Sequence, residues 1–175
     1  MILTGSKIIE SVNNGSIYID NFEIESVTTN SYDLRLGNTL IKYKDEVLDP
    51  MKENKFESID IPEAGYLLHS GCFILGESKE IINSNEFVPI IHAKSGIARK
   101  GLFVHVTADL IDIGYKGNIT FQFYATFPLK IYKNMKIAQV SFWKPYGDIV
   151  LYTGKYQNNK GPQPSKSYLD RIEEV

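Results

Sequence analysis

The sequence predicts a mainly β protein, a β-sandwich or jelly roll with a short N-terminal helix and a C-terminal arm. Between Ser16 and Trp143, short apolar or alternating runs follow one another and are separated by turn residues, which is typical of antiparallel β proteins. The chain has 11 Tyr and 9 Phe residues, and aromatic side chains favour half-buried, pleated surfaces. Its 175 residues are enough for one domain with a sizeable core.

The elements follow in order. Residues 7–13 place their apolar side chains on one helical face, after a Thr4 or Ser6 cap and before a stop at Asn14 and Gly15. Strands are expected at 17–19, 32–36, 39–43, 66–75, 87–92, 102–107, 118–124, 129–131 and 136–142. No repeat or linker divides the chain, so we expect a single domain of residues 1–175. Its β core is expected to cover approximately residues 1–145, and residues 146–175 to form an arm or lid.

Composition excludes several classes of protein. A formal net charge of -2 gives no overall field that would attract nucleic acid. Cys72 is the single cysteine and has no partner for an intrachain disulfide, and the three histidines lack zinc spacing. The sequence shows no apolar signal core and no apolar run of about 18 residues. We therefore expect a cytoplasmic protein, or one in the host cytoplasm if the chain is viral, that binds no membrane.

Three features between residues 93 and 143 suggest chemistry. First, the turn at residues 94–101 carries two cations, a hydroxyl and a glycine, and can present backbone N–H groups and charge to an anion. Second, Asp112 lies in a turn closed by two glycines, where it could hold a sugar hydroxyl or orient water. Third, the alternation in residues 118–124 puts Gln122 on a polar strand face. Taken singly, a solvated basic turn, an ordinary Asx turn and a solvent-facing strand explain them as well.

The order of these features resembles the family of trimeric dCTP deaminases and dUTPases. The resemblance runs from residues 1–3 through 30–37 and the long central segment to 156–157 and 161–165. Within it, segments 104–112 and 135–139 are more similar to dCTP deaminases than to dUTPases. It implies a distorted jelly roll of the trimeric dUTPase type and a homotrimer with sites at subunit interfaces. It also implies a dCTP or dUTP ligand with Mg²⁺ bound through the triphosphate and no protein side chain as metal ligand. Whether dTTP inhibits is left open.

The resemblance assigns roles to positions of this chain. Ser95 and Arg99, with the position of Gln122, would act in catalysis; Ala108 would face the pyrimidine edge, and Asp112 the sugar hydroxyl or a water aimed at the α-phosphate. Ile119 would pack on the sugar. The implied nucleotide-binding residues are Lys94, Ser95, Gly96, Arg99, Ala108, Asp112, Ile119, Gln122, Tyr146, Lys155, Tyr156 and Asn159.

Gln122 departs from the family pattern, because dCTP deaminases carry a glutamate there as general base. An amide does not accept a proton near neutral pH, and losing a general base typically costs about 10²–10⁴-fold in rate. Three explanations stay open: an engineered substitution that traps substrate, a weakened or lost deamination, or phosphoanhydride cleavage that needs Asp112 alone. The chain lacks the His-x-Glu and Pro-Cys-x-x-Cys motifs of zinc-dependent deaminases, so no zinc is expected.

The function predicted from the sequence is hydrolytic deamination of dCTP to dUTP and ammonia, weakened by Gln122. The first alternative is a dUTPase or a bifunctional enzyme that cleaves the triphosphate to dUMP and diphosphate. The second is a nucleotide-binding regulator without catalysis.

Overall fold

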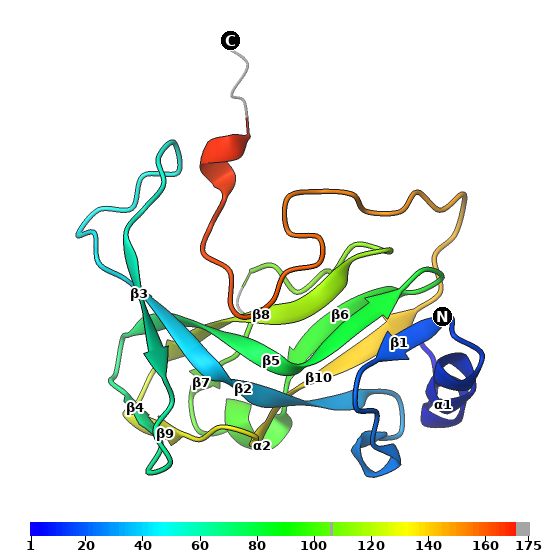
Figure 1. Ribbon diagram of the computed structural model, residues 1–175. Coiled ribbons are helices and arrows are strands. Elements are labelled where there is room, and N and C mark those ends of the chain that lie inside the picture. Colours follow the sequence, from blue (N-terminus) through cyan, green and yellow to red (C-terminus); the bar gives the residue numbers. More distant parts are fainter. Residues whose placement is uncertain (106, 171–175) are drawn as a thin grey trace.

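The computed structural model describes residues 1–105 and 107–170, and it confirms the mainly β fold (Figure 1). Helix α1 (Gly5–Asn13) buries Ile8 against the sheet and ends at the predicted stop. Thr4 stands at the N-cap, but its hydroxyl contacts Ser6 Oγ at 3.2 Å and no helix N–H. None of the helices in these two described segments has the length and apolar character to span a membrane.

The remaining elements are strands and short helices. The strands are β1 (Ile17–Ile19), β2 (Tyr32–Tyr43), β3 (Phe56–Asp60), β4 (Tyr66–Leu68), β5 (Phe73–Ser84), β6 (Val88–Ala93), β7 (Leu102–Phe103), β8 (Lys116–Ala125), β9 (Leu129–Ile131) and β10 (Lys136–Trp143). The short helices are η1 (Ile24–Ser26), α2 (Ser95–Ala98) and η2 (Ser167–Leu169).

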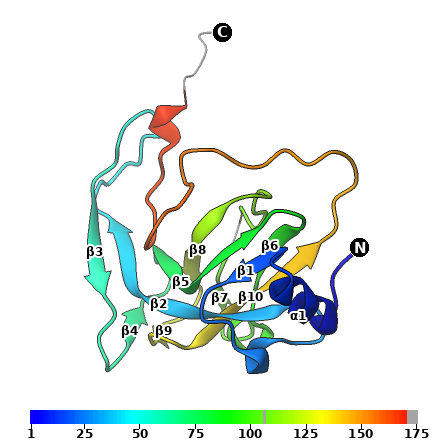
Figure 2. The same cartoon turned by 45° about the vertical axis from the view of Figure 1, so that its right-hand side comes forward.

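One curved sheet holds most of these strands. Its order is β6-β10-β2-β5-β8-β7, while β1 pairs with β5 and β3 pairs with β2; β4 and β9 form a separate pair. All the registered pairs are antiparallel. Register shifts interrupt β2–β5 between Leu36 and Leu40, and β5–β8 between Glu77 and Ile81. Bulges of this kind bend a sheet, and the two long strands β2 and β5 curve across the molecule in both views (Figures 1 and 2).

The core lies inside this curve. The predicted alternation in β8 is confirmed, because Ile119, Phe121 and Phe123 are at most 1% exposed while Gln122 is only partly buried. Tyr32 from β2 and Phe142 from β10 join the same cluster. Each such side chain contributes about 1.5–3 kcal/mol through burial. The core therefore fixes which face of β8 is left for polar residues.

The predicted strands needed four corrections. Residues 32–36 and 39–43 form one strand, because the Glu77 carboxylate accepts the N–H groups of Asn38 and Thr39 at 3.1 Å each and bridges the turn-like sequence. Residues 66–75 divide into β4 and β5, because a turn with Gly71 at φ 77° separates them. Of the run predicted at 102–107, the strand β7 covers Leu102–Phe103, and residue 106 lies outside the described residues; β3 and residues 76–84 of β5 were not predicted as strands.

The C-terminal segment runs over the polar face of β8. Asn158 N donates to Lys116 O at 2.8 Å, Gly161 N to Asn118 Oδ1 at 3.1 Å and Gln163 N to Thr120 Oγ1 at 3.0 Å. Both views show this segment descending onto β8 before it rises into η2 (Figures 1 and 2). It therefore lies against the strand that carries Gln122.

Candidate functional site

A cavity of about 440 Å³ lies between the polar face of β8, the turn that precedes it and the C-terminal segment. Its lining includes six of the residues singled out in the sequence: Ala108, Asp112, Ile119, Gln122, Tyr156 and Asn159. Ile119 is only 1% exposed and belongs to the core, so it offers a ligand little surface. A cavity of this size suits a small molecule.

Gln122 projects from the middle of β8. Its backbone N–H donates to Val104 O at 2.9 Å, and across the sheet it is in register with Leu75 of β5. Thr107 Oγ1 donates to the side-chain Oε1 at 3.5 Å. The strand on each side therefore fixes the backbone of Gln122, while its amide remains at the cavity wall.

Ala108 is held by a neighbouring histidine. His105 Nε2 donates to Ala108 O, and because a carbonyl oxygen only accepts, Nε2 must carry the proton. Burial lowers the pKa of His105 below its ordinary value, although the Ala108 carbonyl and Asp109 oppose the shift. The ring is therefore neutral at pH 7, and its buried Nδ1 has no hydrogen-bond partner within the described segments.

Asp112 is exposed in the turn that enters β8. The turn closes through Tyr115 N, which donates to Asp112 O at 3.1 Å, and through Gly114 N, which donates to Ser84 O at 2.7 Å. Gly114 has φ 89°, and a Cβ there would lie 2.8 Å from Leu151 Cβ. Only glycine fits this backbone. Asp112 is the one carboxylate among the described residues that line the cavity.

Asn159 ties the C-terminal segment to β8. Its Nδ2 donates to Asn118 O at 3.1 Å and to Gly161 O at 3.2 Å, and its Oδ1 contacts the Tyr115 hydroxyl. Burial is the main cause that raises the pKa of Tyr115, so the phenol stays protonated. Within a single chain, the Asn159 side chain is thus occupied in holding the segment in place.

The basic turn lies outside this cavity. Lys94, Ser95, Gly96 and Arg99 belong to the start and end of α2, and none of the four lines the cavity. Arg99 Nη1 donates to Ser95 Oγ at 3.3 Å. No Lys or Arg is found among the described residues that line the cavity.

Lys94 is engaged with a buried carboxylate. Its Nζ lies 2.5 Å from Asp33 Oδ1, and Lys136 Nζ lies 3.6 Å from Asp33 Oδ2. The Asp33 side chain is only 8% exposed. Beside it, Gln139 Nε2 donates to Ala93 O at 3.3 Å. These contacts anchor the residues from which the basic turn starts.

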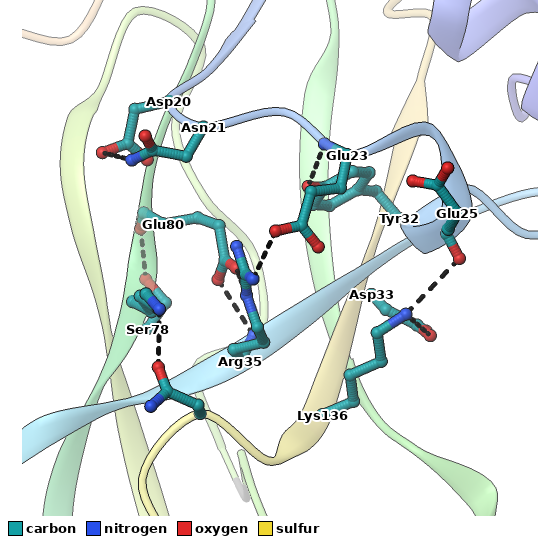
Figure 3. Close-up of polar contacts among 12 residues, drawn as sticks. Asp20, Asn21, Glu23, Glu25, Tyr32, Asp33, Arg35, Ser78, Glu80 and Lys136 are labelled. Carbon is teal, nitrogen blue, oxygen red and sulfur yellow. Dashed lines mark hydrogen bonds and ion pairs between the residues drawn. The ribbon is translucent and has the colours of Figure 1, made fainter.

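Next to Asp33, a second ion-pair cluster joins β2, β5 and the loop before η1 (Figure 3). Arg35 Nε donates to Glu80 Oε1 and its Nη1 to Glu23 Oε1, both at 2.6 Å, and the Glu80 side chain is 1% exposed. Removing one partner of such a buried pair is strongly destabilising. This cluster therefore maintains the fold around the base of the turn.

The other two predicted residues also lie elsewhere. Tyr146 is fully exposed at 107%. Lys155 pairs with Asp170 and lies 5.8 Å from the centre of the Tyr156 ring. Neither lines the cavity.

Several residues that form the cavity were not singled out from the sequence. They are Tyr43, Phe73, Leu75, His105, Tyr115 and Tyr152. Leu75 reaches the site through its register with Gln122. Tyr152 reaches it through a tilted contact with the Tyr115 ring, with ring centres 6.1 Å apart. Such contacts between distant segments leave no local pattern in a sequence.

The sequence was compared with known proteins. The family model described as dCTP deaminase-like matches residues 2–145. Two proteins named "dCTP deaminase, dUMP-forming", from Clostridium botulinum and Clostridium beijerinckii, are 42% and 40% identical over 171 residues. Each alignment covers 97% of this chain and 98% of the relative. The chain belongs to the dCTP deaminase-like family.

Solved structures agree with this dCTP deaminase-like fold. The 2'-deoxycytidine 5'-triphosphate deaminase of Agrobacterium tumefaciens superposes with a TM-score of 0.64 at 21% identity over 81% of this chain. The match covers 47% of that structure, so this chain spans about half its length. A Staphylococcus bacteriophage 80alpha dUTPase gives a TM-score of 0.50 at 12% identity. The predicted family and the dUTPase-like jelly roll are therefore confirmed, while the residue roles stay predictions.

Proposed function

We propose that the protein is a hydrolase of pyrimidine deoxynucleoside triphosphates that takes dCTP to dUMP. Water replaces the 4-amino group to give dUTP and ammonia, and a second water attacks the α-phosphate to give dUMP and diphosphate. The observation that carries this proposal is the nearly full-length similarity to relatives named as dUMP-forming dCTP deaminases. The cavity that joins Ala108, Asp112 and Gln122 supports it.

Asp112 is the residue to which we assign the second step. It is the one carboxylate among the described residues of the cavity wall, so it can take up the proton of a water aimed at phosphorus. Ala108 presents its backbone to the pyrimidine edge. A carboxylate in hydrogen-bond reach of water is a usual general base.

Gln122 limits the first step. Its amide can hold and orient a water but cannot accept a proton near neutral pH. We therefore expect deamination about 10²–10⁴-fold below that of an enzyme with a glutamate here, while triphosphate cleavage keeps its base. This observation favours a second candidate function: cleavage of dUTP to dUMP without deamination.

Mg²⁺ is part of the proposal and would be held through the triphosphate. Mg²⁺ prefers oxygen ligands and is commonly bound by one or two carboxylates together with substrate phosphates. The described residues contain no group of three or more His, Cys, Asp or Glu arranged for a metal ion. A cation carried by the nucleotide, near Asp112, fits this donor set. The cation would offset the phosphate charge. Asp112 would act on the attacking water, and the Ala108 backbone would orient the pyrimidine ring.

We further propose a homotrimer in which the basic turn of one copy completes the cavity of the next. A triphosphate needs cations, and the described part of the cavity wall supplies none. Ser95 and Arg99 would come from a second copy. Exposed Phe73, Phe103 and Tyr124 lie side by side across β5, β8 and β7 at 46%, 51% and 40% exposure. Such an aromatic patch is typical of a protein interface.

The decisive experiment incubates the purified protein with Mg²⁺ and either dCTP or dUTP and separates the products by chromatography. We expect dUMP and diphosphate from dUTP, and slow dUMP formation with ammonia release from dCTP. Asp112→Asn should abolish dUMP formation from both nucleotides. Cleavage of dUTP with no turnover of dCTP would select the second candidate. Binding of both nucleotides without any product would show a regulator and overturn both.

A further inference from the structure

Hydrogen bonds engage the acceptor oxygens that Ala108 and Gln122 contribute to the cavity. His105 Nε2 donates to Ala108 O, and Thr107 Oγ1 donates to Gln122 Oε1 at 3.5 Å. Ala108 O and Gln122 Oε1 thus each already accept a hydrogen bond from a donor of the turn between β7 and β8. Ala108 O keeps one further lone pair, because a carbonyl oxygen has two.

The same contacts leave donors free. With Oε1 turned toward Thr107, the Gln122 amide points its Nε2 away from that turn, and no hydrogen bond to Nε2 occurs in the two described segments. An amide nitrogen carries two N–H donors and accepts nothing. Gln122 is partly buried on the cavity side of β8. A ligand at this point therefore meets a donor that needs an acceptor.

Uracil and cytosine differ at position 4 of the ring, the group that such a donor would contact. Uracil has the O4 acceptor and an N3–H donor, and the free lone pair of Ala108 O suits the latter. Cytosine has a 4-amino donor, which would face the donors of Gln122, and an N3 acceptor, which would face the carbonyl. A polar group left unpaired in a closed site is unfavourable, and sites built to hydrogen-bond one group reject the analogue lacking it.

We propose that Thr107 and His105, acting through Gln122 and Ala108, set this pocket to prefer a uracil ring over a cytosine ring. The inference rests on the proposed binding of a pyrimidine deoxynucleoside triphosphate and names dUTP as the preferred ligand. Neither Thr107 nor His105 has to touch the ring. They are positioning residues, because His105 engages the carbonyl oxygen of Ala108 and Thr107 engages the amide of Gln122, and these two groups would contact the ring.

The orientation of the amide is the part that Thr107 controls. At 3.5 Å the Thr107 hydroxyl makes a long, weak hydrogen bond that favours Oε1 on its side of the amide, whereas valine has the same shape and no hydroxyl. In Thr107→Val the amide is free to turn Oε1 toward the cavity and accept from a cytosine amino group. In Gln122→Glu the side chain has acceptors only, so it should pair with cytosine and repel O4.

The test measures binding of the α,β-imido analogues of dUTP and dCTP with Mg²⁺ by titration calorimetry. We expect the wild type to bind the uracil analogue about 10–100-fold more tightly, which corresponds to one mispaired polar group. Gln122→Glu should reverse the preference, and Thr107→Val should reduce it several-fold. Thr29→Val is the matched control: Thr29 is exposed beside α1 and does not line the cavity, so its ratio should equal that of the wild type.

Two results would overturn the inference. Equal affinity of the wild type for the two analogues would do so, and so would a ratio that neither Gln122→Glu nor Thr107→Val changes. In both cases nucleotide binding itself would remain, so the proposed function would stand. Failure of both analogues to bind at all would overturn the proposed function together with the inference.

Discussion

At the scale of single residues, Gln122 distinguishes deamination from triphosphate cleavage, the two steps combined in the relatives' name "dCTP deaminase, dUMP-forming". Its neighbours on β8 are fixed by the core, since Phe121 and Phe123 are fully buried, so the side chain at 122 must face the cavity whatever its chemistry. Glutamate and glutamine have the same shape but differ in proton affinity. On the proposed mechanism, the backbone would therefore hold position 122 where a general base would act, while glutamine does not supply that base.

The substitution Gln122→Glu should restore that function. We expect the rate of ammonia release from dCTP to rise by about 10²–10⁴-fold, because a carboxylate can take the proton of the attacking water and pass it to the leaving amine. A coupled assay for ammonia measures it. Asp112→Asn in the same background should keep ammonia release and lose dUMP. An unchanged rate would show that position 122 does not supply the missing base.

His105 makes stability depend on pH. Burial lowers its pKa below the ordinary value of 6.5, so below about pH 6.5 the unfolded chain binds more protons than the folded one. The free energy of unfolding should therefore fall as the pH decreases from 7 to 5, by at most about 1.4 kcal/mol per unit of pKa depression. Urea titrations at several pH values measure this slope.

The His105→Gln variant should lose part of that slope, and His69→Gln, at an exposed turn position, should keep it. A wild type whose stability is the same at pH 5 and pH 7, or a His105→Gln variant with the full slope, would contradict the assignment.

Sequence patterns located the site only in part. Asp112 and Gln122 could be found because each lies in or shortly before β8, where a local motif or the period of two defines its direction. Ala108 was implied only by the family resemblance. Lys94 shows the limit, because its partner Asp33 is 61 positions away and turns it toward a buried carboxylate. Pairings across the sheet decide such contacts, and no local motif reports them.

At the scale of elements, strands that contain fully buried apolar residues were predictable, whereas the half-exposed strand β3 was not. β9 was predicted to the residue, and β8 and β10 nearly so. β3 was missed because its alternating exposed and half-buried positions include Glu57 and Asp60, so its pattern resembles a loop. Glu77 likewise hid the continuity of β2, since its caps on Asn38 and Thr39 come from another strand.

One of the contacts that attach the C-terminal segment to β8 is very close. A Cβ at Gly117 would lie 2.1 Å from Asn159 Oδ1, so Gly117→Ala should push Asn159 off Asn118 and Tyr115. We expect faster tryptic cleavage at Lys155 and Lys160 and a KM for nucleotide raised several-fold, because the segment opens locally at little cost to the sheet.

Asn159→Ala should give the same cleavage pattern by a separate route, since it deletes the bonds to Asn118 O and Gly161 O. Gly96→Ala is the control for proteolysis, because nothing lies within 4 Å of its Cβ position. Unchanged cleavage in both variants would mean that other bonds hold the segment.

At the scale of the whole molecule, the carboxylate of the cavity and the cation of the basic turn lie apart within one chain. The cavity contains Asp112 and no cation within the described residues, while Arg99 lies on α2 beyond its wall. A triphosphate would be repelled by the first group and neutralised by the second. A closed ring of copies, in which every interface is the same, can bring the two together.

Mixed trimers test this arrangement directly. Arg99→Ala and Asp112→Asn should each be inactive, because each removes one half of every site. Co-expressed in equal amounts, they should regain about a quarter of wild-type dUMP formation, since random assembly in a cyclic ring joins an intact Arg99 to an intact Asp112 at about one interface in four. Sedimentation velocity must show the trimer in all three samples, and the two proteins mixed without subunit exchange serve as the control. Stable mixed trimers without any recovered activity would place Arg99 and Asp112 in the same copy's site, or remove Arg99 from it.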